Sequence, residues 1–251
     1  MRDDIIEHFI DEGLIEGVIR PLRHGKEASV ELCRANRRTT DHDLLALKIF
    51  HPLDRRDFRD ESLYRQGEFI KERRVRVALE QKTKFGRQVQ GGLWVARERE
   101  TLRKLESTPV PAPRPVAATD EAILMTYIGD VDQAAPRLQE YRADESELEP
   151  LWDQLLSAVG TMLFNDVVHG DLSPFNVLVW EGRVTVIDFP QAVDPKKNQH
   201  AEEFLARDVQ RVGAWFQRFG FEQDWETVAG DLWASWTNAD LIPPELRSEM
   251  F

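Results

Sequence analysis

The chain has 251 residues, of which 41% are hydrophobic and 31% charged, an ordinary composition for a globular protein. Its formal charge of −12 argues against general coating of nucleic acid, and no apolar run approaches the roughly 18 residues that span a bilayer. The N-terminus lacks the basic and apolar regions of a secretory signal, and the single cysteine, Cys33, excludes an intramolecular disulfide. We therefore expect a cytoplasmic protein without membrane segments.

The first fifth of the chain predicts a short helix followed by three strands. Apolar residues at helical spacing indicate the helix over residues 5–15. Residues 17–35 indicate two strands around a tight turn at 24–29, and residues 44–50 form an apolar strand that contains Lys48. Lysine is unfavourable to bury without a partner, so Lys48 either reaches the strand edge or binds a charged ligand. A turn that could cover phosphates lies just upstream, which favours the ligand.

Residues 52–92 are long, charged and interrupted by Gly86, Gly91 and Gly92, which indicate breaks. Within this segment, residues 68–81 favour a helix. From residue 65 to residue 104 there are twelve Lys and Arg against five Glu. A basic patch on an acidic protein suits a phosphate-rich partner, and a solvated helical face explains it equally well.

A further helix is expected over residues 93–105, where Glu98 and Glu100 point in different directions. One of the two could pair with Lys48. A proline-rich connector over residues 108–115 ends this helix and leads to a buried strand over 122–128. We expect a boundary between two lobes near Gly129.

The strongest helix signal covers residues 146–164, where apolar residues follow a three-four spacing. Ser146 and Glu149 predict a capping box at its start. Further helices are expected over residues 201–219 and 225–236.

Between these helices lies a short polar loop with the layout of a phosphoryl-transfer centre. It reads His-Gly-Asp-Leu-Ser-Pro-Phe-Asn over residues 169–176, and Asp188 ends the apolar strand that follows. In such centres one carboxylate orients the acceptor, while an Asn–Asp pair holds magnesium against nucleotide phosphates. Residues 176–187 predict a hairpin with its turn at 181–183, which would hold Asn176 and Asp188 at one end of two paired strands.

The order of these motifs resembles the protein-kinase-like fold and, more narrowly, the RIO family of atypical kinases and ATPases. The resemblance runs from about residue 17 to residue 220. The most specific part is D-L-S-x-x-N at residues 171–176 together with I-D-x-x-Q at 187–191. The other supporting segments are G-K-E-A-S-V at 25–30, L-K-I-F at 47–50, S-L-Y at 62–64, Trp94 with Glu98, and M-T-Y-I-G at 125–129.

The resemblance implies an α+β, bilobal kinase-like fold in a single domain over residues 1–251. The N-terminal lobe (1–128) would hold an antiparallel sheet plus a helix, and the C-terminal lobe (129–251) would be small and helical. The implied activity is magnesium-dependent phosphoryl transfer from ATP to serine or threonine, including autophosphorylation, or to water. Asp171 would be the catalytic carboxylate, and Asn176 and Asp188 would bind magnesium. Asp188 is also a candidate phosphate acceptor.

The resemblance also implies which residues bind ATP. Lys48 would contact the phosphates and be held by Glu98. Met125 would lie behind the adenine, to which Tyr127 and Ile128 would make backbone hydrogen bonds. The residues expected over the triphosphate are Gly25, Lys26, Glu27, Ala28 and Ser29.

The sequence differs from ordinary protein kinases in three respects, and these differences bear on the expected substrate. Arg23 and Ala28 replace two glycines of the phosphate loop, and Pro190 replaces the glycine of D-F-G. Only 63 residues follow Asp188, too few for an activation segment and a peptide-binding helical subdomain. The docking surface for a peptide substrate is therefore expected to be absent.

Family members in archaea and eukaryotes assist maturation of the small ribosomal subunit, so the basic segment 65–104 would suit a ribosomal particle or rRNA. Two other functions stay open. A small-molecule phosphotransferase of the aminoglycoside-kinase type shares the loop and the strand-end Asp, but it needs a larger C-terminal helical region. A non-catalytic ATP-binding module is disfavoured, since Lys48, Asp171, Asn176 and Asp188 are all present.

Overall fold

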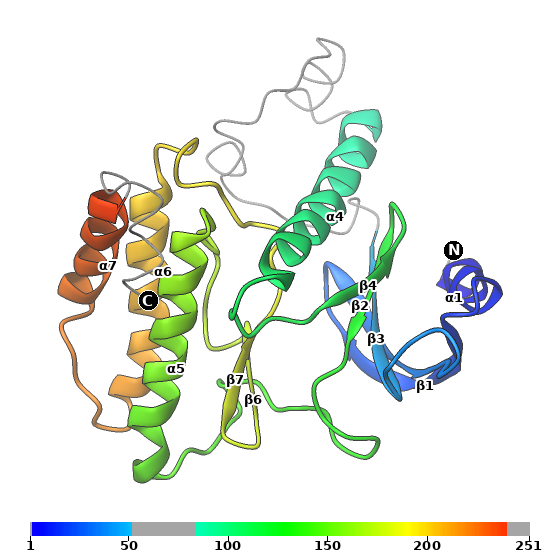
Figure 1. Cartoon of the computed structure of the whole chain (residues 1–251), viewed down its shortest axis with the longest axis horizontal. Coiled ribbons are helices and arrows are strands. Elements are labelled where there is room, and N and C mark those ends of the chain that lie inside the picture. Colours follow the sequence, from blue (N-terminus) through cyan, green and yellow to red (C-terminus); the bar gives the residue numbers. More distant parts are fainter. Residues whose placement is uncertain (1, 52–83, 240–251) are drawn as a thin grey trace.

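The structure is a computed structural model that describes residues 2–51 and 84–239. Figure 1 shows a sheet at one end of the molecule, a group of helices at the other, and a small hairpin between them. The helix predicted over residues 68–81 lies outside the described residues.

A five-stranded antiparallel sheet forms the N-terminal part, in the order β1-β2-β3-β5-β4. Its strands are β1 (Ile15–His24), β2 (Ala28–Ala35), β3 (Leu44–Phe50), β4 (Pro115–Ala118) and β5 (Ala122–Thr126). The central strand β3 is buried on both faces, which explains its continuous apolar run. Strand β5 ends two residues earlier than predicted, so Tyr127 and Ile128 follow the strand.

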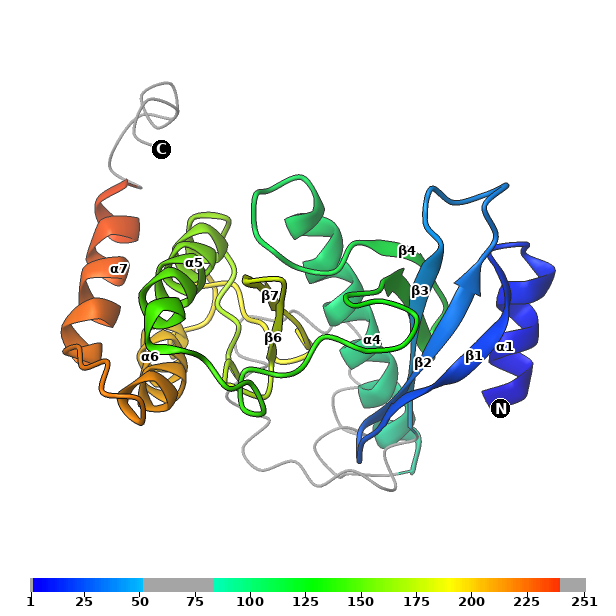
Figure 2. The same cartoon turned by 90° about the horizontal axis from the view of Figure 1, so that it is seen from below.

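Each face of the sheet is covered by one helix (Figure 2). Helix α1 (Arg2–Asp11) packs Ile5 and Phe9 on the face that carries Leu45, Leu47 and Ile49. Helix α4 (Lys84–Glu106) lies on the other face, where Val95, Leu102 and Leu105 join the main core with Ala46 and Ile123.

The breaks predicted at Gly86, Gly91 and Gly92 are wrong, because α4 runs through all three glycines. A glycine inside a helix costs only about 1 kcal/mol relative to alanine. The helix buries Val95, Leu102 and Leu105 further along, and this packing outweighs a local preference of that size.

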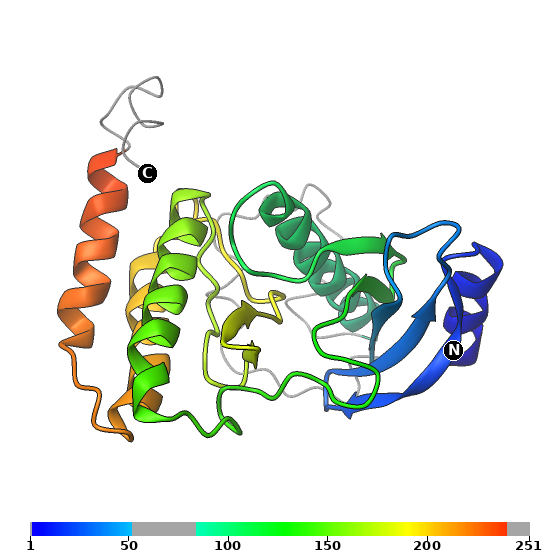
Figure 3. The same ribbon diagram turned by 60° about the horizontal axis from the view of Figure 1, so that its bottom comes forward.

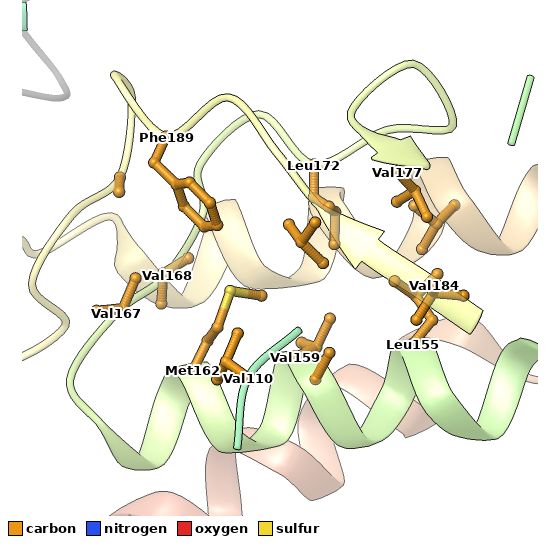
Figure 4. Packing of buried hydrophobic residues seen from close by; sticks show 14 of the residues in the cluster. Val110, Leu155, Val159, Met162, Val167, Val168, Leu172, Val177, Val184 and Phe189 are labelled. Carbon is orange, nitrogen blue, oxygen red and sulfur yellow. The ribbon is translucent and has the colours of Figure 1, made fainter. Parts of the chain in front are cut away.

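The C-terminal part consists of α5 (Glu145–Phe164), α6 (Ala201–Gln217) and α7 (Trp225–Ala239), with the hairpin β6 (Val177–Trp180) and β7 (Arg183–Val186) on the side of the sheet (Figure 3). Side chains of α5, the hairpin and the loops around it form one core (Figure 4). Gly213 of α6 lies against Trp225, where an added Cβ would come within 2.4 Å of the indole.

Two local features differ from the prediction. The capping interaction of α5 lies two residues earlier, because the Asp144 N–H donates to Glu147 Oε2 at 2.8 Å. The hairpin turn is shorter by one residue, because Arg183 pairs with Trp180. Glu181 and Gly182 close this turn with φ angles of 49° and 71°, the left-handed pair that suits a two-residue hairpin loop.

After Asp188 the described chain continues through residues 189–200 and then forms only α6 and α7 up to residue 239. The α+β class and the sheet-plus-helix N-terminal part agree with the expectation. None of the helices in the described ranges is long and apolar enough to cross a membrane.

Candidate active site

A cavity of about 370 Å³ lies where the sheet, α4 and the β6–β7 hairpin meet. Its walls are mostly apolar, with one group of charged side chains where β3 and α4 approach Asp188 and a second group at Arg23, Arg137 and Glu140. The cavity is lined by residues of the sheet and α4, among them Leu22, Arg23, Val30, Ala46, Lys48, Glu98, Leu102 and Met125, and of the later segments, among them Tyr127, Ile128, Ala135, Arg137, Glu140, Leu178, Ile187 and Asp188.

Lys48 joins two carboxylates at the polar end of this cavity. Its Nζ donates to both oxygens of Glu98 at 2.7 Å and to Asp188 Oδ1 at 2.6 Å. Lys48 is 8% exposed and Glu98 is 1% exposed, so this contact is shielded from water. Of the two glutamates left open by the sequence, Glu98 is therefore the partner of Lys48.

Burial and charge act in opposite directions on this trio. Burial lowers the pKa of Lys48, but Asp188 and Glu98 together raise it above its ordinary value. Burial raises the pKa of Glu98 to about 7, although Lys48 opposes the rise. Burial also acts to raise the pKa of Asp188, yet Lys48 prevails and holds it below the usual range. Asp188 is thus an ionised carboxylate at neutral pH.

His169 connects the polar loop to the segment around Asp188. Its Nε2 donates to the Ile187 carbonyl at 3.1 Å, and its Nδ1 accepts the Asp171 N–H at 3.3 Å. Burial lowers the pKa of His169, which fits a neutral ring with one donor and one acceptor nitrogen. The ring also packs on Phe189, with centroids 4.9 Å apart. His169 therefore fixes Asp171 relative to the strand end, where Asp188 has a φ of 73°.

Asn176, the second predicted metal ligand, is buried near Asp188 but does not line the cavity. Its Nδ2 donates to the Asp171 carbonyl at 2.9 Å, which directs the amide oxygen elsewhere. The Asn176 carbonyl accepts the Ile187 N–H at 2.9 Å, so Asn176 lies beside the segment that follows β7 and carries Asp188. An amide oxygen and a carboxylate are hard ligands that suit magnesium, which commonly takes few protein ligands and completes its shell with phosphate and water. The donor set therefore fits magnesium.

Asp208 of α6 binds the backbone of the polar loop, a role that was not predicted from the sequence. It is 1% exposed, and its oxygens accept the N–H groups of Gly170 at 2.7 Å and Leu172 at 3.0 Å. Arg207 donates to the Gly170 carbonyl. Burial raises the pKa of Asp208 to about 8, against the two N–H donors and Arg207, which favour the charged form. The sequence feature that could have indicated this role is an acidic residue on the apolar side of the helix predicted over residues 201–219.

Asp171 itself lies at the surface of the loop. Its Oδ1 accepts a hydrogen bond from Arg211 Nη1 at 2.8 Å, and the two side chains are 40% and 43% exposed. Neither residue lines the cavity. Asp208 thus fixes the backbone on both sides of Asp171, and Arg211 binds its carboxylate. The rest of the Asp171 side chain faces solvent.

The predicted phosphate-covering turn lies next to the cavity lining but does not contribute to it. The turn closes with the Gly25 N–H donating to the Ala28 carbonyl at 2.9 Å, and Gly25 and Lys26 are exposed. Together with Glu27 and Ala28, they do not line the cavity.

Ser29 does not face the cavity. It pairs with Ile49 in the sheet, whereas the next residue, Val30, pairs with Lys48. Directly paired residues of antiparallel strands share a face. The 2%-exposed Ser29 side chain therefore lies on the α1 face, and its predicted position over the triphosphate is wrong.

The predicted adenine-binding residues do line the cavity. Met125 pairs with Ala46, and Tyr127 and Ile128 follow on the segment after β5. The Ile128 carbonyl already accepts the Ala135 N–H at 3.1 Å. The Ile128 N–H has no hydrogen-bond partner in the described part of the chain and stays available to a ligand.

Comparison with known proteins agrees with this geometry. The RIO domain profile matches residues 34–228, most of the chain. The chain belongs to the RIO family. The relatives that it matches are named serine/threonine-protein kinases, and the chain is an enzyme of this kinase family.

Three relatives give the extent of the similarity. The chain is 30% identical over 230 residues to the RIO-type serine/threonine-protein kinase Rio1 of Haloferax volcanii, covering 90% of this chain and 73% of the relative. It is 38% identical over 132 residues to Rio1 of Thermoplasma acidophilum, covering 53% and 68%. Human RIO1 is 30% identical over 216 residues, which is 85% of this chain but 36% of the human protein.

Among solved structures, the fold is similar to that of the Rio2 kinase–ADP/Mg2+–phosphoaspartate complex from Chaetomium thermophilum. The TM-score is 0.66 at 19% identity, and the match covers 91% of this chain and 65% of the Rio2 chain. At this identity the match bears on the fold alone. It confirms the predicted kinase-like fold.

Proposed function

We propose that this RIO-family enzyme binds ATP with magnesium in the cavity and transfers the γ-phosphoryl group to a serine or threonine, its own included, or to water. One observation supports this most strongly. Lys48, Glu98 and Asp188 meet in one ion cluster, with Lys48 and Glu98 buried, at one end of a cavity whose lining is mostly apolar. A purine fits the apolar part, and the polar end suits the phosphates.

The adenine would lie between apolar side chains of the two walls, such as Val30 and Ala46 from the sheet and Leu178 from the hairpin. The Ile128 N–H would donate to the base. In this arrangement Lys48 is held by Glu98 and contacts the phosphates, which pull it partly away from Asp188.

Asn176 and Asp188 would hold the metal. Magnesium bound there would offset the negative charge of the phosphate oxygens during transfer. The low pKa of Asp188 keeps this carboxylate ionised and ready to coordinate at neutral pH. Because Lys48 contacts Oδ1 of Asp188 at 2.6 Å, the metal would share this carboxylate with the ammonium group.

Asp171 would orient the acceptor hydroxyl. The acceptor oxygen attacks the γ-phosphorus, the bond to the β-phosphate oxygen breaks, and ADP leaves, while the hydroxyl proton passes to Asp171. Asp188 is a second candidate acceptor, since an ionised carboxylate can form an acyl phosphate. The Rio2 neighbour, described as a phosphoaspartate complex, motivates testing this route.

The cellular role that we propose is assistance to small-ribosomal-subunit maturation in the cytoplasm, with rRNA or a ribosomal particle contacting the basic segment 65–104. Residues 65–83 lie outside the described residues, so the support is the charge excess of this stretch. RNA affinity of the intact chain should fall steeply between 50 and 200 mM salt if phosphate contacts dominate, as roughly 0.9 counterions are released per contact. A flat response would leave the segment as a solvated face.

The alternative of an aminoglycoside-type phosphotransferase is less favoured, since the RIO profile matches most of the chain. In the described residues after Asp188, only α6 and α7 are present to build a substrate pocket. The same shortage is the reason to expect no extended peptide-docking surface.

A radiolabel assay separates the proposed outcomes. Wild-type protein is incubated with magnesium and γ-labelled ATP, with and without a serine- and threonine-containing protein acceptor. Formation of ADP is measured beside label on the protein. Label that survives hydroxylamine is on serine or threonine, and label released by it is an acyl phosphate. No ADP and no label at any magnesium concentration would contradict the proposed function.

A further inference from the structure

Arg137 is a cation in the cavity for which the described residues supply no paired counter-charge. It lies on the segment between β5 and α5, lines the cavity and is half-buried. Within the described residues its guanidinium makes no hydrogen bond and no ion pair. By contrast Lys48, on the opposite wall, contacts two carboxylates at 2.7 and 2.6 Å.

The backbone around Arg137 is fixed. Arg137 forms a β-bridge with Leu178 of the hairpin, and its carbonyl accepts the N–H groups of Glu140 at 2.8 Å and Tyr141 at 2.9 Å. The neighbouring Leu138 N–H donates to Val177 at 2.8 Å. The position of Arg137 at the cavity wall is therefore set by the fold.

The surroundings leave this guanidinium in an unfavourable place without a ligand. Burial lowers the pKa of Arg137, and the positive charge of Arg23 acts in the same direction. Asp188 and Glu140 attract it more weakly. Glu140 forms an ion pair with Arg23, whose Nη1 lies 3.9 Å from Glu140 Oε1. Asp188 forms its ion pair with Lys48. A half-buried arginine in such a site is stabilised by an anion that enters the cavity.

The charges of Lys48, Glu98 and Asp188 also leave the phosphates of a bound nucleotide insufficiently neutralised. Lys48 carries one positive charge against the two negative charges of Glu98 and Asp188. One magnesium ion would make this group only slightly positive, whereas the triphosphate of ATP carries about four negative charges. Arginine suits phosphate because its planar guanidinium can donate two parallel hydrogen bonds.

We propose that Arg137 is a phosphate-binding residue of the nucleotide site, which holds the polyphosphate from the wall opposite Lys48. This inference rests on the proposed ATP-binding function and adds a residue to it. Arg23, across the cavity mouth, adds positive charge to the same region. Because Arg137 has no partner in the described chain, its removal leaves no orphaned group and the unliganded protein stays folded.

The test compares Arg137→Ala with the wild type by calorimetric titration of adenosine, ADP and ATP, without and with magnesium. A charged hydrogen bond contributes about 1.5–3 kcal/mol, so ATP affinity should fall by about 10- to 150-fold. Adenosine affinity should change by less than about twofold, and Arg137→Lys should restore part of the ATP affinity. Inorganic tripolyphosphate serves as a second probe, whose stabilisation of the wild type in thermal unfolding should be lost.

Arg142→Ala is the matched control. Arg142 lies five positions further along the same segment, is exposed and does not line the cavity, so ATP affinity should stay at the wild-type value. Equal losses for adenosine and ATP in Arg137→Ala would overturn the proposal, since the contact would then be to the nucleoside. Unchanged ATP affinity would overturn it too. A wild type without ATP affinity would remove the proposed function and this inference together, whereas a wild type that binds ATP as tightly as Arg137→Ala removes the inference alone.

Discussion

Replacing Lys48 with methionine should destabilise the protein strongly, whether or not nucleotide is present. Methionine fills a similar volume but leaves the 1%-exposed Glu98 without the ammonium that now contacts both of its oxygens at 2.7 Å. Removing one partner of a buried pair typically costs about 3–5 kcal/mol. Asp188 adds less, because its side chain is 32% exposed and water can replace Lys48 there.

The loss should depend on pH in a defined direction. The pKa of Glu98 is already raised from 4.5 to about 7 by burial, and Lys48 opposes that rise. Without Lys48 the pKa rises further. A carboxyl with a native pKa above its unfolded value keeps a proton that the unfolded chain releases, so its stabilising contribution is present at low pH and is lost as the pH increases. Lys48→Met should therefore be closest to wild-type stability near pH 4.5 and furthest from it above pH 7.

Urea unfolding followed by tryptophan fluorescence measures this, with buried Trp94, Trp152 and Trp215 as reporters. Lys48→Met combined with Glu98→Gln should recover most of the lost free energy of unfolding, because the buried charge is gone. Lys26→Met, at an exposed lysine of the β1–β2 turn, is the control and should stay within about 0.5 kcal/mol of the wild type. A Lys48→Met variant within 1 kcal/mol of the wild type at pH 7.5, or a double variant as unstable as the single one, would refute this reasoning.

Three other substitutions probe the site. Asp188→Asn should weaken ATP binding by about tenfold in the presence of magnesium and much less without it; equal effects in the two titrations would speak against the metal site. Asp208→Asn keeps one acceptor for the loop N–H groups, so unfolding free energy should drop by about 1–3 kcal/mol and turnover should fall at unchanged ATP affinity. Arg211→Gln should lower turnover with a stability change under about 1 kcal/mol, because its ion pair with Asp171 is part-exposed; unaltered turnover would leave Arg211 without a role.

The strongest sequence patterns led to accurate elements. The strand over residues 44–50 was predicted at its observed bounds, because an apolar run of this length between polar loops has few alternatives. The hairpin before Asp188 followed from β-branched residues on both sides of Glu181 and Gly182. Helix α5 was misplaced by one residue at its start, since Asp144 competes with Ser146 as a cap.

The positions and roles that the sequence did not predict depend on contacts between residues that are far apart in the chain. Ser29 was expected at the phosphates, but its pairing with Ile49 puts it on the face opposite Lys48, and that register cannot be read from β2 alone. Asp208 bonds groups 36 and 38 residues away, and Arg211 bonds Asp171 across 40 residues. In the sequence such residues look like ordinary polar positions of a helix. That Arg137 lines the cavity without a hydrogen-bond or ion-pair partner among residues 2–51 and 84–239 likewise depends on tertiary structure.

Single-turnover transfer of labelled γ-phosphate by the wild type and by Asp171→Asn is the most direct test of phosphoryl transfer at this site. Each protein is first shown by titration to bind ATP with magnesium. We predict that the asparagine variant binds ATP about as tightly as the wild type, because Asp171 does not line the cavity, and that its transfer to protein or water is at least about a hundredfold slower. Transfer at the wild-type rate would contradict the assignment of Asp171, and with it the proposed phosphoryl-transfer centre.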